Sequence, residues 1–224
     1  MQIKTTMQKI ISLRIFQLVI FLSIPFLSTS AQATFPGEKI AFWETATSNE
    51  AEDPKYKKVH QLAKERKYEE ALIILDEKEK SSPGTGTPKI LKAILLNDMG
   101  KPIEALNAMR MGYMEQSRHP AIHFGYCQIY RNLGSAEPSE RACQIAVQQH
   151  PHSAEARFEY AETLKSLGKM KLAIKELTEA AQLDPANVVY PYEIGQLFSY
   201  LNEFNKAEAS YQKAVSVNPQ HLES

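Results

Sequence analysis

Between Glu52 and His221, apolar residues recur at the spacing of an α-helix, in segments that come in pairs. The pattern of each pair repeats at a constant period, from residue i to residue i+34. A break separates the two segments of each pair, at Arg66, Gly100, Gly134, Gly168 and Asn202. The pattern therefore predicts five units, each made of a helix, a tight turn and a second helix: residues 52–85, 86–119, 120–153, 154–187 and 188–221.

The landmark residues of these units resemble those of the tetratricopeptide repeat family. The last unit carries six of them, namely Ile194, Gly195, Phe198, Ala207, Tyr211 and Pro219, and the other four units keep the same phase. The resemblance implies an all-α protein, an α-solenoid of about five helical hairpins that stack into a right-handed superhelix with a concave groove.

Three positions within the unit carry the packing predictions, and each is named by its point, counted from the first residue of the unit. Small residues at points 8 and 20 predict close approach of the two helices, and proline at point 32 predicts the end of the second helix. The family prefers tryptophan at point 4. This chain instead holds Lys55, Lys89, His123, Arg157 and Pro191 there, and carries its bulky side chains at point 5.

Residues 1–33 have the pattern of a secretory signal peptide. Three basic residues precede a short apolar stretch, and a small-x-small cleavage pattern follows: Lys4, Lys9 and Arg14, then Ile15–Leu27, then Ala31-Gln32-Ala33. We predict cleavage after Ala33 and an exported protein, either periplasmic or secreted. The apolar stretch is shorter than the ~20 residues that cross a bilayer, and an uncleaved anchor beginning near Ile10 is the alternative.

Two short segments flank the predicted array. Residues 34–51 form an N-terminal extension that includes the apolar run Ile40–Trp43, and residues 222–224 form a C-terminal tail. Removal of the signal peptide takes three basic residues and no acidic ones. The mature chain then has 23 Lys and Arg against 26 Asp and Glu, a formal charge of −3. This charge offers no basic excess to attract nucleic acid, and we expect no stable membrane span after cleavage.

Residues that carry chemistry are sparse, so we expect no enzymatic activity and no cofactor. The pairs His119 with His123 and His150 with His152 are conceivable metal ligands at turns between units, but no cysteine or carboxylate pair completes a set. We expect solvated or capping histidines instead. The glycine-bearing segment 81–86 lacks the Gly-Lys-Ser/Thr of a phosphate loop and is predicted to be a linker.

Cys127 and Cys143 stand at points 8 and 24 of one unit. An antiparallel hairpin that turns near Gly134 would place them opposite each other, and export favours a disulfide. The other four units carry a larger side chain at point 24, as if bulk had been exchanged here for a crosslink. Two free thiols acting as small core residues are the alternative.

The family resemblance also implies a binding surface, because points 2, 5, 6, 9, 12 and 13 of each first helix line the concave groove in that family. The last three units mix aromatic and acidic character at these points: Phe124, Gln128 and Arg131; Glu155, Phe158, Glu159 and Glu162; Tyr192, Glu193, Gln196 and Tyr200. Such a groove suits a basic or amphipathic peptide. The alternative is that the aromatic residues pack internally and the carboxylates are merely solvated.

The family's clamp for a terminal carboxylate is not expected here. The positions that would carry its lysines, arginine and asparagines hold Tyr56, His60, Leu91, Ala121 and Gly125. Recognition of a terminal carboxylate is therefore not carried over from the family to this chain.

The sequence favours a non-catalytic interaction module, a scaffold or adaptor of the bacterial cell envelope, whose groove binds a segment of another envelope protein. Two alternatives belong to other classes. One is an accessory subunit of an envelope enzyme or maturation system, such as the helical-repeat components of cytochrome c assembly. The other is a self-assembling structural scaffold, because no polar cap follows the last unit in this sequence; we expect weak self-association there through residues such as Tyr211 and Val215.

Overall fold

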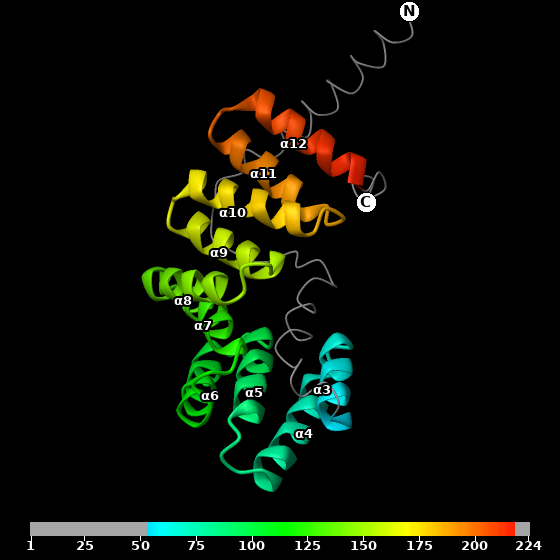
Figure 1. Ribbon diagram of the computed structural model, residues 1–224, viewed down its shortest axis with the longest axis vertical. Helices are drawn as coiled ribbons and strands as arrows, with labels where there is room; N and C mark the ends of the chain where they lie inside the picture. The colour runs from blue at the N-terminus through cyan, green and yellow to red at the C-terminus, as the bar shows by residue number, and fades with distance from the viewer. Residues whose placement is uncertain (1–52, 218–224) are drawn as a thin grey trace, which may run out of the picture. The chain divides into compact units, whose positions relative to one another are not determined.

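The computed structural model describes residues 53–217, which form ten α-helices and no strand (Figure 1). The predicted signal peptide, N-terminal extension and C-terminal tail lie outside the described residues. The helices form five consecutive pairs: α3 (Pro54–Lys64) with α4 (Tyr68–Ser81), α5 (Thr87–Asp98) with α6 (Pro102–Glu115), α7 (Ala121–Asn132) with α8 (Ala136–Gln149), α9 (Ala154–Ser166) with α10 (Met170–Leu183), and α11 (Val189–Tyr200) with α12 (Phe204–Val217). The predicted all-α solenoid of helical hairpins is confirmed.

The hairpins stack in chain order. Each first helix packs against the second helix of its own pair, and each second helix packs against the first helix of the next pair. The first helices α5, α7 and α9 also contact one another in sequence. The second helices begin at Tyr68, Pro102, Ala136, Met170 and Phe204, which stand at the same point of their units, so the period of the sequence is the repeat of the structure.

The predicted breaks are the turns of the hairpins. Gly100, Gly134 and Gly168 adopt positive φ angles of 71–74°, in the left-handed region where a side chain is unfavourable. Arg66 and Asn202 take the same conformation, with φ of 56° and 59°, although each carries a side chain. The repeated turn therefore overrides the local preference of arginine.

Proline is not what ends the second helices. The helices α4, α8 and α10 stop two residues before Pro83, Pro151 and Pro185, as the sequence suggests, but α6 stops at the same point with Ser117 in place of proline. The residue after each of these helices has φ between −125° and −143° and ψ between 65° and 82°, which is outside the helical region. The connection to the next hairpin sets the end of the helix, and proline is compatible with it. Pro219 lies outside the described residues.

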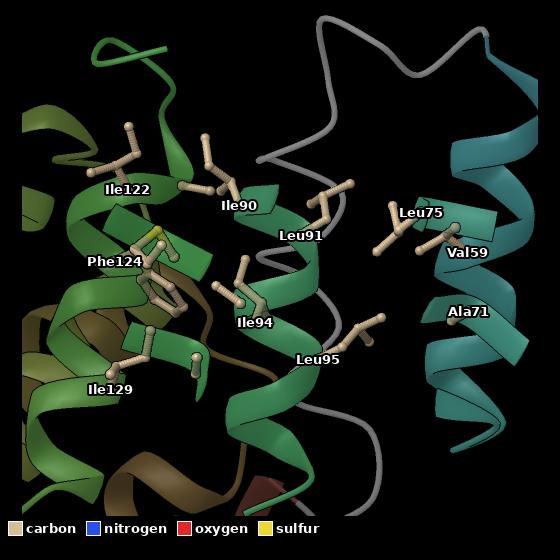
Figure 2. Close-up of a cluster of buried hydrophobic side chains, with 14 of the residues drawn as sticks. Val59, Ala71, Leu75, Ile90, Leu91, Ile94, Leu95, Ile122, Phe124 and Ile129 are labelled. Carbon is tan, nitrogen blue, oxygen red and sulfur yellow. The ribbon is translucent and has the colours of Figure 1, made fainter. Parts of the chain in front are cut away.

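The core is a ribbon of side chains between neighbouring helices. At points 8 and 20 the small side chains are buried, and the larger side chains at point 24 fill the space beside them: Leu75, Met109 and Leu177 are at most 1% exposed. Figure 2 shows one stretch of this ribbon, in which Ile90 and Ile94 of α5 lie on the side of Ile122 and Phe124 of α7.

In three of the five units, a cation at point 4, where the family prefers tryptophan, joins the two helices of the hairpin. Lys89 lies 2.5 Å from Glu115, Arg157 lies 2.9 Å from Glu176, and Lys55 lies 3.3 Å from Glu77. In each case the first helix is joined to the second helix of its own hairpin by an ion pair. The hydrogen bond from Lys89 to Glu115 raises the pKa of Lys89, so this cation stays charged although it is nearly buried.

Leu177 provides a test of the ribbon core. Replacing Leu177 with alanine should lower the free energy of unfolding by about 3 kcal/mol, because the side chain is fully buried and a cavity would remain. Leu172→Ala on the same helix is the matched control, since Leu172 is 50% exposed and its loss should cost less than about 0.5 kcal/mol. Urea denaturation followed by circular dichroism measures both, and equal losses would contradict the assignment of Leu177 to the core.

Candidate functional site

The points predicted to line the groove meet one another from one first helix to the next. Points 9 and 12 of α7 face point 6 of α9: Gln128 donates from Nε2 to Oε1 of Glu159 at 2.8 Å, and Arg131 Nη2 lies 2.7 Å from Oε2. Lys165, at point 12 of α9, lies 2.6 Å from Glu193 at point 6 of α11. These contacts define a first-helix face, which consists of points 2, 5, 6, 9, 12 and 13 of α3, α5, α7, α9 and α11.

Three carboxylates of this face, those of Glu159, Glu162 and Glu193, are paired with cations. Glu159 is only 4% exposed and shares its two oxygens between Gln128 and Arg131. Glu162 and Glu193 both contact Lys165, at 2.7 and 2.6 Å. Burial lowers the pKa of Lys165, but the two carboxylates outweigh burial and raise it overall, so the lysine remains charged. The acidic patch suggested by the sequence is therefore largely neutralised within the array.

The aromatic residues of the face divide into packing residues and exposed ones. Phe124 is 1% exposed and belongs to the core. Phe158 and Tyr192 are partly buried and pack on neighbouring rings, with centroids 5.7 Å from Tyr190 and 5.7 Å from Tyr211. Tyr200, at point 13 of α11, is 69% exposed. Of the groove residues named from the sequence, Glu155, Glu162 and Gln196 are partly accessible as well.

The structure joins Cys127 and Cys143 in a disulfide between α7 and α8, with both residues at most 1% exposed. A hydroxyl cluster that the sequence reasoning missed surrounds it. Ser139 donates to the carbonyl of Cys127 at 2.8 Å, and Thr163 Oγ1 lies 3.0 Å from Ser139 Oγ and 3.2 Å from the sulfur of Cys143. Serine at point 20, where the other units hold alanine, is the signal that would have found this cluster.

Thr163 connects the hydroxyl cluster around the disulfide to the first-helix face. It lies on α9, one helical turn after Glu159, so the same helix contacts the disulfide hairpin through Thr163 and Arg131 of α7 through Glu159. The disulfide-linked hairpin of the third unit therefore helps to hold α9, and with it Glu159 at the centre of the face, in position.

The histidines act as caps between units. His119 is 5% exposed, and its Nδ1 accepts the backbone N–H of Ala121 at 3.2 Å. His150 donates from Nε2 to the carbonyl of Pro120 at 3.2 Å. Burial lowers the pKa of His119 to about 4. Among residues 53–217, no group of three His, Cys, Asp or Glu side chains is arranged to hold a metal ion.

None of the helices within residues 53–217 combines the length and the apolar character that crossing a bilayer would require.

Comparisons with known proteins agree with the fold. The tetratricopeptide repeat family model matches residues 154–187 and 192–221. BBSome complex member BBS4 of Mus musculus is 28% identical over 131 residues, which is 58% of this chain and 25% of that protein, and the Bos taurus protein is 28% identical over 124 residues. This chain thus spans about a quarter of the length of these curated relatives.

Solved structures extend the similarity over most of the array. MamA of Desulfovibrio magneticus RS-1 matches with a TM-score of 0.64 at 14% identity, over 83% of this chain and 98% of that one. TTC0263 of Thermus thermophilus, a thermophilic TPR protein, matches with 0.62 at 18%, over 75% and 91%. YrrB, a TPR protein with an unusual peptide-binding site, matches with 0.59 at 19%, over 80% and 94%. At these identities the likeness concerns the fold.

Removal of the disulfide should weaken the third hairpin. Replacing both cysteines with serine should lower the free energy of unfolding by about 3 kcal/mol, because 16 residues separate the bonded positions and the unfolded chain regains that freedom. The matched variant, Cys127→Ala with Cys143→Leu, installs the pair that Ala161 and Leu177 form in the next unit and should recover part of the loss. Urea denaturation measures both variants. Native unreduced protein should resist alkylation, and labelling of both thiols would contradict the bond.

Acid should weaken the cap at His119. The unfolded histidine takes up a proton near pH 6.5 and the folded one only near pH 4, so stability is intact above pH 6.5 and falls as the pH drops toward 4. The expected loss on reaching pH 4 is roughly 3 kcal/mol. Asparagine can accept the same N–H without titrating, so His119→Asn should flatten this part of the curve of unfolding free energy against pH. An unchanged slope in the variant would show that other groups cause the acid sensitivity.

Proposed function

We propose that this chain, which is similar to tetratricopeptide repeat proteins in sequence and fold, is a non-catalytic interaction module that binds a segment of another protein on its first-helix face. The exposed aromatic ring of Tyr200 on that face is the observation that carries the proposal. A large amphipathic ring held on a rigid helix loses little entropy on binding and commonly anchors a partner.

The surroundings of Tyr200 favour an amphipathic partner over a strongly basic one. Tyr192 and Gln196 are partly accessible on the same helix and offer an apolar ring and an amide. Two carboxylates of the face, Glu162 and Glu193, are already paired with Lys165. A partner gains little from charge alone on this surface, and gains more from an apolar side chain that packs on the rings with polar groups at the edge.

The array also provides the rigidity that such a surface needs. Lys165 joins α9 to α11, and Arg131 joins α7 to α9, so the face is held by contacts across three hairpins. Related architecture supports this use of the fold: YrrB is a TPR protein with an unusual peptide-binding site, and BBS4 is a member of a protein complex.

We place the protein in the bacterial cell envelope on two grounds. Residues 1–33 have the pattern of a secretory signal, and the disulfide of the third hairpin is of a kind that persists in oxidising compartments. The partner is accordingly another exported protein or an exported segment of a membrane protein. The module would hold or deliver that partner without transforming it.

Tyr200→Ala tests the face. A partner is first captured from envelope extract with the mature protein as bait and identified by mass spectrometry, and its affinity for each variant is then measured by calorimetry. The alanine variant should bind about tenfold more weakly or worse, because the anchoring ring is lost while the fold is intact.

Phe204→Ala is the matched control, because Phe204 is also an exposed ring, at 58%, but stands at the start of the second helix α12. Its affinity should stay within about twofold of the parent protein, since rings outside a binding face contribute little. If the partner bound the parent protein and the Tyr200 variant with equal affinity, the first-helix face would be excluded as the binding surface. Glu159 is unsuitable for this test, because its loss would leave Arg131 unpaired inside the array.

A further inference from the structure

Helix α5 is the most buried of the first helices. Nine of its twelve residues are buried, against seven of twelve in α7, five of thirteen in α9 and five of twelve in α11. In a single layer of stacked hairpins, a first helix is covered by its neighbours on either side and leaves the first-helix face open. The burial of α5 extends onto that face.

Leu91 shows how α5 differs from the other first helices on this face. It stands at point 6, where the other units carry Lys57, Gly125, Glu159 and Glu193, and it is 0% exposed. Figure 2 shows that Leu91 and Leu95 project from α5 away from α7, on the side of α3 and α4. The first-helix face is therefore apolar at α5 and polar from α9 onward.

Other side chains of the face have partners as well. Seven residues at points 2, 5, 9 and 13 each take part in an interaction: Tyr56, His60, Lys64, Thr87, Asp98, Phe124 and Glu155. The polar contacts between neighbouring first helices described above use other side chains, at points 6, 9 and 12. The seven residues run along one face from α3 to α9, and an occupant of that face would lie against them.

We propose that this occupant is the chain's own N-terminal extension, residues 34–51, which lies outside the described residues. The extension carries the apolar run Ile40–Trp43, which matches the apolar surface at Leu91, and then the acidic residues Glu44 and Glu50. Helix α3 is basic, with Lys57 and Lys64 at points 6 and 13 of the face. Apolar contact and charge therefore both favour docking of the extension onto α3 and α5.

The chain between Trp43 and the start of α3 is long enough for the extension to reach α5. Trp43 precedes Asp53 by ten positions, and an extended chain of that length spans at most about 33–36 Å. Packed helices are about 8–10 Å apart. Helix α4 packs on both α3 and α5, so α5 lies two such steps from α3 and within reach. Because the extension is attached where α3 begins, its effective concentration is high and a modest interface suffices.

The occupant divides the face. The extension covers the part formed by α3, α5 and α7, and the part around Tyr200 on α11 remains for a partner. The inference uses the same face as the proposed function, but it requires no external partner. An experiment can therefore disprove the docking of the extension without disproving the binding of a partner, and the reverse.

Trp43 is the only tryptophan of the chain and reports on the extension in the full-length protein. Its fluorescence should be blue-shifted from that of water-exposed indole and protected from acrylamide. Phe42→Asp should shift the emission to the red and raise the quenching constant several-fold, while the helical circular dichroism is unchanged. Thr47→Asp, which adds the same charge outside the apolar run, should leave both readouts as in the parent protein.

Lysine crosslinking followed by mass spectrometry gives the location independently. Lys39 of the extension should be joined to Lys64 or Lys92, close to α3 and α5. A water-exposed Trp43 in the parent protein would overturn the proposal. So would crosslinks from Lys39 only to the lysines of α12, or protection of Trp43 that disappears on dilution, which would assign the occupant to a second copy of the chain.

Discussion

The close approach of two antiparallel helices at points 8 and 20 is the constraint on which every hairpin of the array depends. The side chain at point 24 must fit beside that contact, and the smallest residue at point 8 stands with the largest residue at point 24. Gly195 stands with Tyr211, and a Cβ on Gly195 would lie 2.6 Å from the tyrosine ring. Ala161 stands with Leu177, a smaller side chain. In the third unit a disulfide joins Cys127 to the residue at point 24, so a covalent bond replaces packing volume.

The third hairpin shows how a change in the core reaches the surface. Serine at point 20 brings a hydroxyl into a buried position, where it needs partners, and it finds them in the carbonyl of Cys127 and the hydroxyl of Thr163. Thr163 lies one turn from Glu159, whose carboxylate is held by Arg131. A buried ion pair is costly unless its geometry is fixed, and the crosslinked hairpin fixes the position of α7 relative to α9.

The helices and turns could be predicted from the sequence because a constant period, repeated five times, outweighs local preference, even at Arg66 and Asn202. The residues of the face were predicted less well. Glu159 and Glu193 stood out as acidic, but each is paired with a cation of the preceding unit, Arg131 and Lys165. That pairing joins point 12 of one unit to point 6 of the next. It becomes visible only when stacking places neighbouring units side by side, so patterns within one unit do not reveal it.

The same pairing determines how binding at one part of the face affects another. In a solenoid each unit contacts only its neighbours, so an occupant on α3 and α5 stabilises those hairpins and acts on α11 only through the units between them. The two ion pairs that cross from α7 to α9 and from α9 to α11 provide that connection. If an occupant on α5 affects a partner at Tyr200, the effect must pass through contacts such as those of Arg131 and Lys165. The coupling is limited to the energy by which these contacts differ between the occupied and open states.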